Sequence, residues 1–246
     1  MIANQAADGL SPGPTFQMMR GEEAIVRLLN GGSGPAAMHL HGSPTHSPWD
    51  GWASDLVQPG DYKDYYYPNT QAGPLWYHDH VAAATAPDVY YGQAGVYLIF
   101  DPAEDALGLP LGDYDIPLAI QDKIYQSNGD LASPTGDNLN FFGDIIQVNE
   151  QPWPYLAVEP RKYRLRFFCM SLSRGYELQF VDEESSDLID VQVIASDAGL
   201  FTGPVTTNDI VISMGERYEV VIDFAPYKGK NITLANNEAN QQGVPQ

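Results

Sequence analysis

The chain has 246 residues, of which 43% are hydrophobic and 18% are charged, and this composition is typical of a globular protein. Its 32 acidic residues outnumber 12 basic ones, and the net charge of -20 argues against nucleic acid or an anionic membrane as a partner. No apolar run approaches the roughly 20 residues that cross a bilayer. The first residues lack the charged and apolar regions of a signal peptide, so no compartment is assigned.

Frequent turn-forming residues favour short strands over long helices, because the chain contains 19 prolines and 23 glycines. A strand, a turn and a second strand are expected within residues 15–29, and a short helix or loop at 82–87. Further strands are expected at 61–67 and 96–100, both beside the strand around residue 78, and then at 116–120, 145–148, 163–168, 176–180, 191–194, 209–213 and 219–224. An acidic stretch rich in Pro and Gly at 102–113 separates the two groups of strands. The pattern predicts an all-β fold of two β-sandwiches, residues 1–106 and 107–246.

Four of the five histidines occur in two His-x-His motifs. Side chains two apart on a strand share one face, so His39 lies on the same face as His41, and His78 on the same face as His80. If the two strands are neighbours, the four imidazoles converge and form a metal site. The alternative is that each pair consists of ordinary polar residues on a half-buried strand, with no role in metal binding. Imidazole binds copper, zinc, iron or nickel, so the ligands alone do not name the metal.

The two motifs and several other segments resemble the multicopper oxidases, in particular the bilirubin oxidase and spore-coat laccase group. The segments that carry the resemblance are 73–80 (GPLWYHDH), 92–95 (GQAG), 101–105 (DPAED), 151–154 (QPWP), 158–164 (VEPRKYR) and 216–218 (ERY). The resemblance implies that both sandwiches are cupredoxin-like Greek-key domains. It also implies copper, with His39 as a type 2 ligand and His41, His78 and His80 as type 3 ligands. Zinc is the alternative metal for such a partial site.

The loop at 43–60 contains two further candidates. Asp50 follows the HLHG motif at the spacing of an acid that relatives place beside the trinuclear copper site, where it is thought to help deliver protons to oxygen. The resemblance therefore implies a catalytic proton donor, and the alternative is a turn residue before Gly51. His46, the remaining histidine, is interpreted as a solvated loop residue rather than a ligand.

A blue copper site needs two histidines and a cysteine thiolate. Cys169 is the only cysteine, which also excludes an intrachain disulfide. It lies in the half of the chain that contains no histidine, and only His46 is uncommitted. We therefore expect no blue type 1 copper and interpret Cys169 as a small buried hydrophobic residue.

Relatives carry a third domain with the blue site and the other four histidines of the cluster, and more strand sequence before the first turn; neither is found in this sequence. The sequence thus predicts a copper-binding oxidoreductase scaffold, incomplete as written. The family reaction is oxidation of phenolic or pyrrolic small molecules coupled to reduction of oxygen to water.

The alternative is a stand-alone, repurposed scaffold. It would act as a non-redox enzyme of a cyclisation or coupling step, or as a metal- or ligand-binding protein. In both cases we expect a small-molecule substrate or ligand, and a second copy or a partner chain that covers the histidine face. Members of the group are often secreted, although this chain shows no signal peptide.

Overall fold

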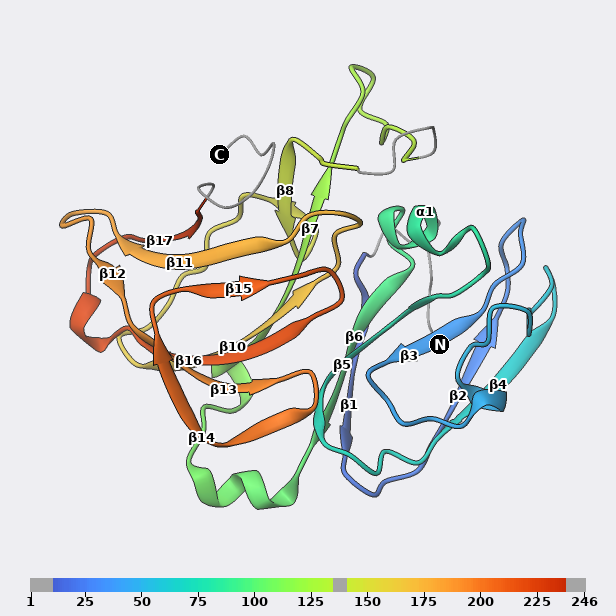
Figure 1. Ribbon diagram of the computed structural model, residues 1–246, viewed down its shortest axis with the longest axis horizontal. Coiled ribbons are helices and arrows are strands. Elements are labelled where there is room, and N and C mark those ends of the chain that lie inside the picture. Colours follow the sequence, from blue (N-terminus) through green and yellow to red (C-terminus); the bar gives the residue numbers. More distant parts are fainter. Residues whose placement is uncertain (1–10, 135–140, 238–246) are drawn as a thin grey trace.

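Strands dominate the computed structural model, which describes residues 11–134 and 141–237 (Figure 1). The only α-helix among the described residues is α1 (Thr85–Tyr90), near the expected helix or loop. The expected all-β fold is confirmed. None of the helices in the described segments has the length and hydropathy needed to cross a bilayer.

The first sheet carries both His-x-His motifs. Its strands, in the spatial order β1-β6-β5-β3, are β1 (Gly13–Met19), β6 (Ala94–Phe100), β5 (Gly73–Asp79) and β3 (Met38–His41). β3 runs antiparallel to β5, and His39 lies directly opposite His78. The expectation that the two histidine strands are neighbours is therefore confirmed.

A separate two-stranded sheet of β2 (Ala24–Leu29) and β4 (Tyr62–Tyr67) forms the opposite layer. The expectation that the strand at 61–67 pairs with the His78 strand is wrong, because β5 pairs with β6 and β3. The reason lies in burial. β4 is buried only at Tyr65 and Tyr67, which pack with Leu40 between the two layers, whereas nearly all of β5 is buried. A half-buried strand suits an outer layer, and a fully buried strand suits the middle of a sheet.

The C-terminal half forms a second pair of sheets. The larger sheet has the order β14-β13-β16-β10-β7-β8-β9, and the smaller one has β12-β11-β15 with β17 also on β11. The strands are β7 (Asp115–Lys123), β8 (Ile145–Val148), β9 (Gln151–Pro152), β10 (Lys162–Cys169), β11 (Tyr176–Asp182), β12 (Leu188–Ile189), β13 (Val191–Ser196), β14 (Gly199–Thr207), β15 (Ile210–Ile212), β16 (Arg217–Asp223) and β17 (Ile232–Asn236). Sequence analysis missed β14 because Gly203 and Pro204 interrupt it; an edge strand tolerates both residues. The predicted division at residues 106 and 107 falls in the 3-10 turn η2 (Pro102–Leu107) and stays a prediction.

The two halves meet at β10, which is buried on both faces. Leu165 and Phe167 point into the core of the C-terminal sandwich. On the opposite face of the strand, Phe168 packs with Trp76 and Leu98 of the N-terminal sheet. Trp76 lies on the histidine strand β5, so this apolar contact joins the second sandwich to the strand that carries His78 and leads into His80.

A network of buried ion pairs extends this contact. Arg164 Nε and Arg166 Nη1 donate to the two carboxylate oxygens of Glu219, at 2.7 and 2.5 Å. Arg164 Nη1 also donates to Glu104 Oε2 at 2.8 Å. Arg166 donates from Nε and Nη2 to the two carboxylate oxygens of Asp115, at 2.6 Å each. These five side chains are all at most 8% exposed. Each guanidinium is therefore hydrogen-bonded to two carboxylates, and the network borders a pocket of about 280 Å³.

Candidate metal centre

The pairing of β3 with β5 brings the four predicted ligands together. The ring centroids of His39 lie 5.8 Å from His41, 5.2 Å from His78 and 5.0 Å from His80. The His78 ring lies 5.6 Å from His41 and 5.8 Å from His80. Each imidazole therefore neighbours at least two others.

His39, His41 and His78 form the tightest group, since one ring nitrogen from each lies within 4.8 Å of the others. His41 Nδ1 and His78 Nε2 are 3.4 Å apart. Two nitrogens at about 2.0–2.1 Å from one tetrahedral ion are separated by about 3.3 Å. The spacing thus fits two imidazoles that share a metal ion, and an all-imidazole set accepts copper as well as zinc, iron or nickel.

Hydrogen bonds to main-chain carbonyls set the orientation of two rings. His39 Nδ1 donates to the Asp50 carbonyl oxygen at 2.8 Å, and His78 Nδ1 donates to the Asp79 carbonyl oxygen at 2.8 Å. With its proton on Nδ1, each ring keeps the lone pair of Nε2 free for a metal. Such bonds from the far nitrogen are the usual way in which proteins fix a metal-ligating histidine.

Burial also keeps His41 and His78 neutral. Desolvation, helped by the positive charge of Arg217, lowers the pKa of His41 to about 4. Desolvation likewise lowers the pKa of His78 to about 3. Neutral imidazole is the form that binds metal, so at pH 7 both rings are ready to coordinate without first losing a proton.

The two remaining histidines differ in their surroundings. His80 Nδ1 is buried and has no hydrogen-bond partner among the described residues. Buried polar atoms are seldom left unpaired, so this nitrogen fits a ligand position next to the three-histidine group. His46 is exposed just before the 3-10 turn η1 (Ser47–Trp49) and lies outside that group.

Asp50 lies beside His39. Its Oδ1 is 3.2 Å from His39 Nδ1 but makes no hydrogen bond, because that N–H is directed at the Asp50 carbonyl. The adjacent Gly51 has a φ of 67°, and a Cβ there would collide with the Met38 carbonyl, so a tight turn brings Asp50 to the site. The proton-donor role of Asp50 stays a prediction.

Sequence analysis missed Asp79, which ends β5 and lies between His78 and His80. Its carboxylate accepts from Ala37 N at 3.0 Å and from Val81 N at 2.8 Å. It thereby ties the start of β3 to the segment after His80. A carboxylate inside a strand of otherwise buried residues was the available signal.

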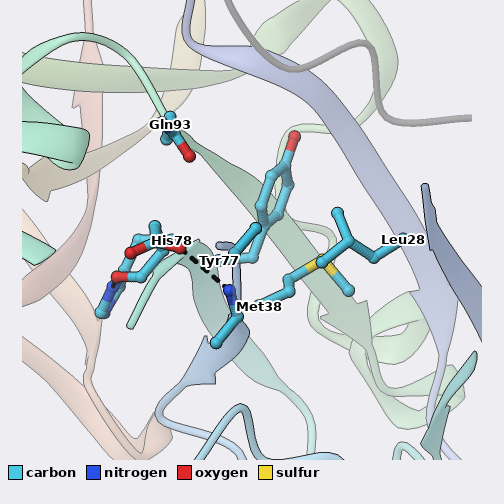
Figure 2. Close-up of a pocket in the computed structure, with 8 residues that line it drawn as sticks. Leu28, Met38, Tyr77, His78 and Gln93 are labelled. Carbon is cyan, nitrogen blue, oxygen red and sulfur yellow. Dashed lines mark hydrogen bonds between the residues drawn. The ribbon is translucent and has the colours of Figure 1, made fainter. Parts of the chain in front are cut away.

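A cavity of about 20 Å³ lies behind these strands, which is enough for about one water molecule. Figure 2 shows five of its lining residues: Leu28, Met38, Tyr77, His78 and Gln93. The cavity is too small for an organic substrate.

An all-β chain of two packed sandwiches, with an imidazole cluster on neighbouring strands of one of them, defines a cupredoxin-like metalloprotein. Two profiles described as "Multicopper oxidase" match residues 3–104 and 118–244. The chain belongs to the multicopper oxidase family.

Individual relatives agree. A bilirubin oxidase of Albifimbria verrucaria is 52% identical over 96% of this chain and 42% of its own length. A laccase of Bacillus subtilis (strain 168) is 37% identical over 94% of this chain and 52% of its own length. The crystal structure of McoA multicopper oxidase from the hyperthermophile Aquifex aeolicus is 32% identical and superposes with a TM-score of 0.87, over 92% of this chain and 51% of that one. The chain therefore spans about half the length of the curated relatives it matches.

Family membership confirms the cupredoxin-like fold and implies copper as the metal. The His39, His41 and His78 group could hold a metal ion. The comparisons lend no support to the alternative of a repurposed non-redox scaffold.

Proposed function

We propose that this chain forms the histidine-bearing part of a copper oxidoreductase that oxidises phenolic or pyrrolic small molecules and reduces oxygen. The observation that carries the proposal is the convergence of one ring nitrogen each from His39, His41 and His78 within 4.8 Å. His80, whose buried Nδ1 lacks a hydrogen-bond partner in the described part of the chain, would complete the set.

Copper, when bound, supplies the one-electron chemistry of the family. The carbonyls of Asp50 and Asp79 orient His39 and His78. Burial keeps His41 and His78 neutral. Asp50 would keep a carboxylate beside the site for proton delivery to oxygen, since its Oδ1 lies 3.2 Å from His39 Nδ1. Zinc remains a second metal to titrate, because the same nitrogen ligands accept it.

Copper bound to this chain alone is expected to be colourless or faint, at one or two ions per chain. Cys169 is buried, burial raises the pKa of its thiol to about 12, and its Sγ donates to the Arg174 carbonyl at 3.4 Å. It packs in the core of the C-terminal sandwich, and residues 107–246 contain no histidine to join it in the two-histidine, one-thiolate set of a blue site.

The measurement is a visible spectrum of copper-loaded protein together with oxygen uptake in the presence of a phenol. No intense blue band and no sustained uptake are expected. A strong blue band with turnover would contradict the assignment and place Cys169 among the copper ligands.

We also propose that a second copy or a partner chain covers part of the surface. Large apolar side chains are exposed in one segment, namely Trp153, Tyr155, Leu156 and Val158. Exposed apolar patches often mark interfaces. Light scattering across a concentration series at moderate salt should show a dimer or larger species. A monomer at the highest concentration would contradict self-association, since the net charge of -20 is screened under those conditions.

A further inference from the structure

We infer that Arg217, on β16 of the C-terminal sandwich, is a positioning residue that holds the His41 side of the metal centre in the N-terminal sandwich. The inference rests on the proposed function, because it assigns a role toward the same centre. Nothing in the two His-x-His motifs points to this arginine, which lies far from them in sequence and in the other half of the chain.

Arg217 is only 3% exposed, and its guanidinium binds main-chain carbonyls from both halves. Nε donates to Pro74 O at 2.8 Å, on the strand that carries His78. Nη1 donates to Gly215 O at 3.1 Å, and Nη2 donates to Asp197 O at 3.0 Å. The Asp197 carboxylate lies 2.9 Å from Nη1 and balances the charge. The side chain thus crosses the junction and joins three backbone segments.

Two of the contacts lead directly to His41. Gly42, which follows His41, leaves room for the guanidinium, because a Cβ at that position would collide with Arg217 Nη2. Gly215, whose carbonyl Arg217 holds, packs against the His41 ring; a Cβ built on it would lie 3.2 Å from His41 Cε1. Trp76 stacks on the same imidazole at 5.0 Å with an interplanar angle of 26°. The His41 ring is therefore packed between β5 and the turn that Arg217 secures.

The planar guanidinium group of arginine, whose N–H donors form a rigid fork, explains why an arginine occupies this position. Three carbonyls in different directions require several donors in a fixed geometry, and the compact ammonium of lysine does not reproduce that geometry. Loss of the guanidinium removes the donor to the buried Pro74 carbonyl and to the part-buried Gly215 and Asp197 carbonyls. The turn at Gly215 is then free to shift against His41. Residues that orient metal ligands from outside the ligand set typically change metal affinity by about 10–100-fold when replaced.

The experiment compares copper(II) affinity of the wild type, Arg217→Met, Arg217→Lys and the control Arg174→Met. Arg174 is an equally buried arginine that donates to the Asp122 carboxylate at 3.0 Å and to Gly143 O at 2.7 Å, both within the C-terminal half. Unfolding of each apoprotein is followed by circular dichroism, and affinity is measured where all the variants are folded. The copper(II) electron paramagnetic resonance spectrum reports the ligand geometry.

Both Arg217 variants are expected to bind copper about 10–100-fold more weakly and to change the resonance spectrum. Arg174→Met is expected to lose stability but to keep the wild-type affinity and spectrum. Equal affinity of the wild type and Arg217→Lys, or an equal loss in Arg174→Met, would overturn the inference while the proposed function stands. Absence of copper binding by the wild type itself would refute the proposed function, and the inference with it. If Arg217→Met does not fold, Arg217→Lys decides, because it retains the charge and removes only the fork.

Discussion

Replacement of His78 by alanine is expected to weaken copper binding by more than the roughly 100-fold that changes outside a ligand set produce. His78 lies at the middle of the cluster: its Nε2 is 3.4 Å from His41 Nδ1, and its ring is 5.2 Å from that of His39. Its Nδ1 is already committed to the Asp79 carbonyl, so Nε2 is the nitrogen that the metal loses.

The matched control is His46→Ala, which removes an exposed imidazole outside the cluster and should leave affinity unchanged. Copper and zinc are each titrated by isothermal calorimetry into both variants and the wild type, and circular dichroism verifies the fold. Equal binding by His78→Ala and the wild type would contradict the proposed site. A loss confined to His46→Ala would place the site in the loop instead.

Glu219→Gln is expected to reduce the free energy of unfolding by about 3–5 kcal/mol. Glu219 is 1% exposed and accepts from both Arg164 and Arg166. The substitution removes the charge that bridges the two guanidinium groups, and it replaces one of the two accepting oxygens by an amide NH2 that can only donate. These arginines lie on the face of β10 that meets the N-terminal half. The substitution should therefore also make the unfolding of the two halves less cooperative.

Urea unfolding followed by circular dichroism and by tryptophan fluorescence measures this effect. The matched control is Arg27→Ala, which removes an exposed ion pair with Asp64. The side chain of Arg27 is 56% exposed and that of Asp64 is 40% exposed. Exposed pairs contribute little because water screens them, so the control should keep the wild-type midpoint. If Glu219→Gln shifts the midpoint no more than Arg27→Ala, the buried network does not stabilise the fold.

Local pattern was sufficient for a large part of the fold. The period of two in β10 places Leu165 and Phe167 in one core, and the same period pairs His39 with His41 on one face. The edge strand β14 was not predicted, since Gly203 and Pro204 interrupt the alternation of apolar and polar residues that identifies a strand. Such a strand is held by its pairing with β13 and not by its own propensity.

For the site, the sequence by itself determined the ligand types, their grouping in two pairs, and the absence of a second cysteine for any disulfide. Only the tertiary structure decided which strands are neighbours, so that β6 and not β4 lies beside β5. It also decided that Asp50 and Asp79 supply the carbonyls that orient the rings, and that Arg217 reaches His41 from the other half. The physical reason is that a strand pattern specifies which face a side chain occupies, whereas strand neighbours and ring orientation depend on packing between segments far apart in sequence.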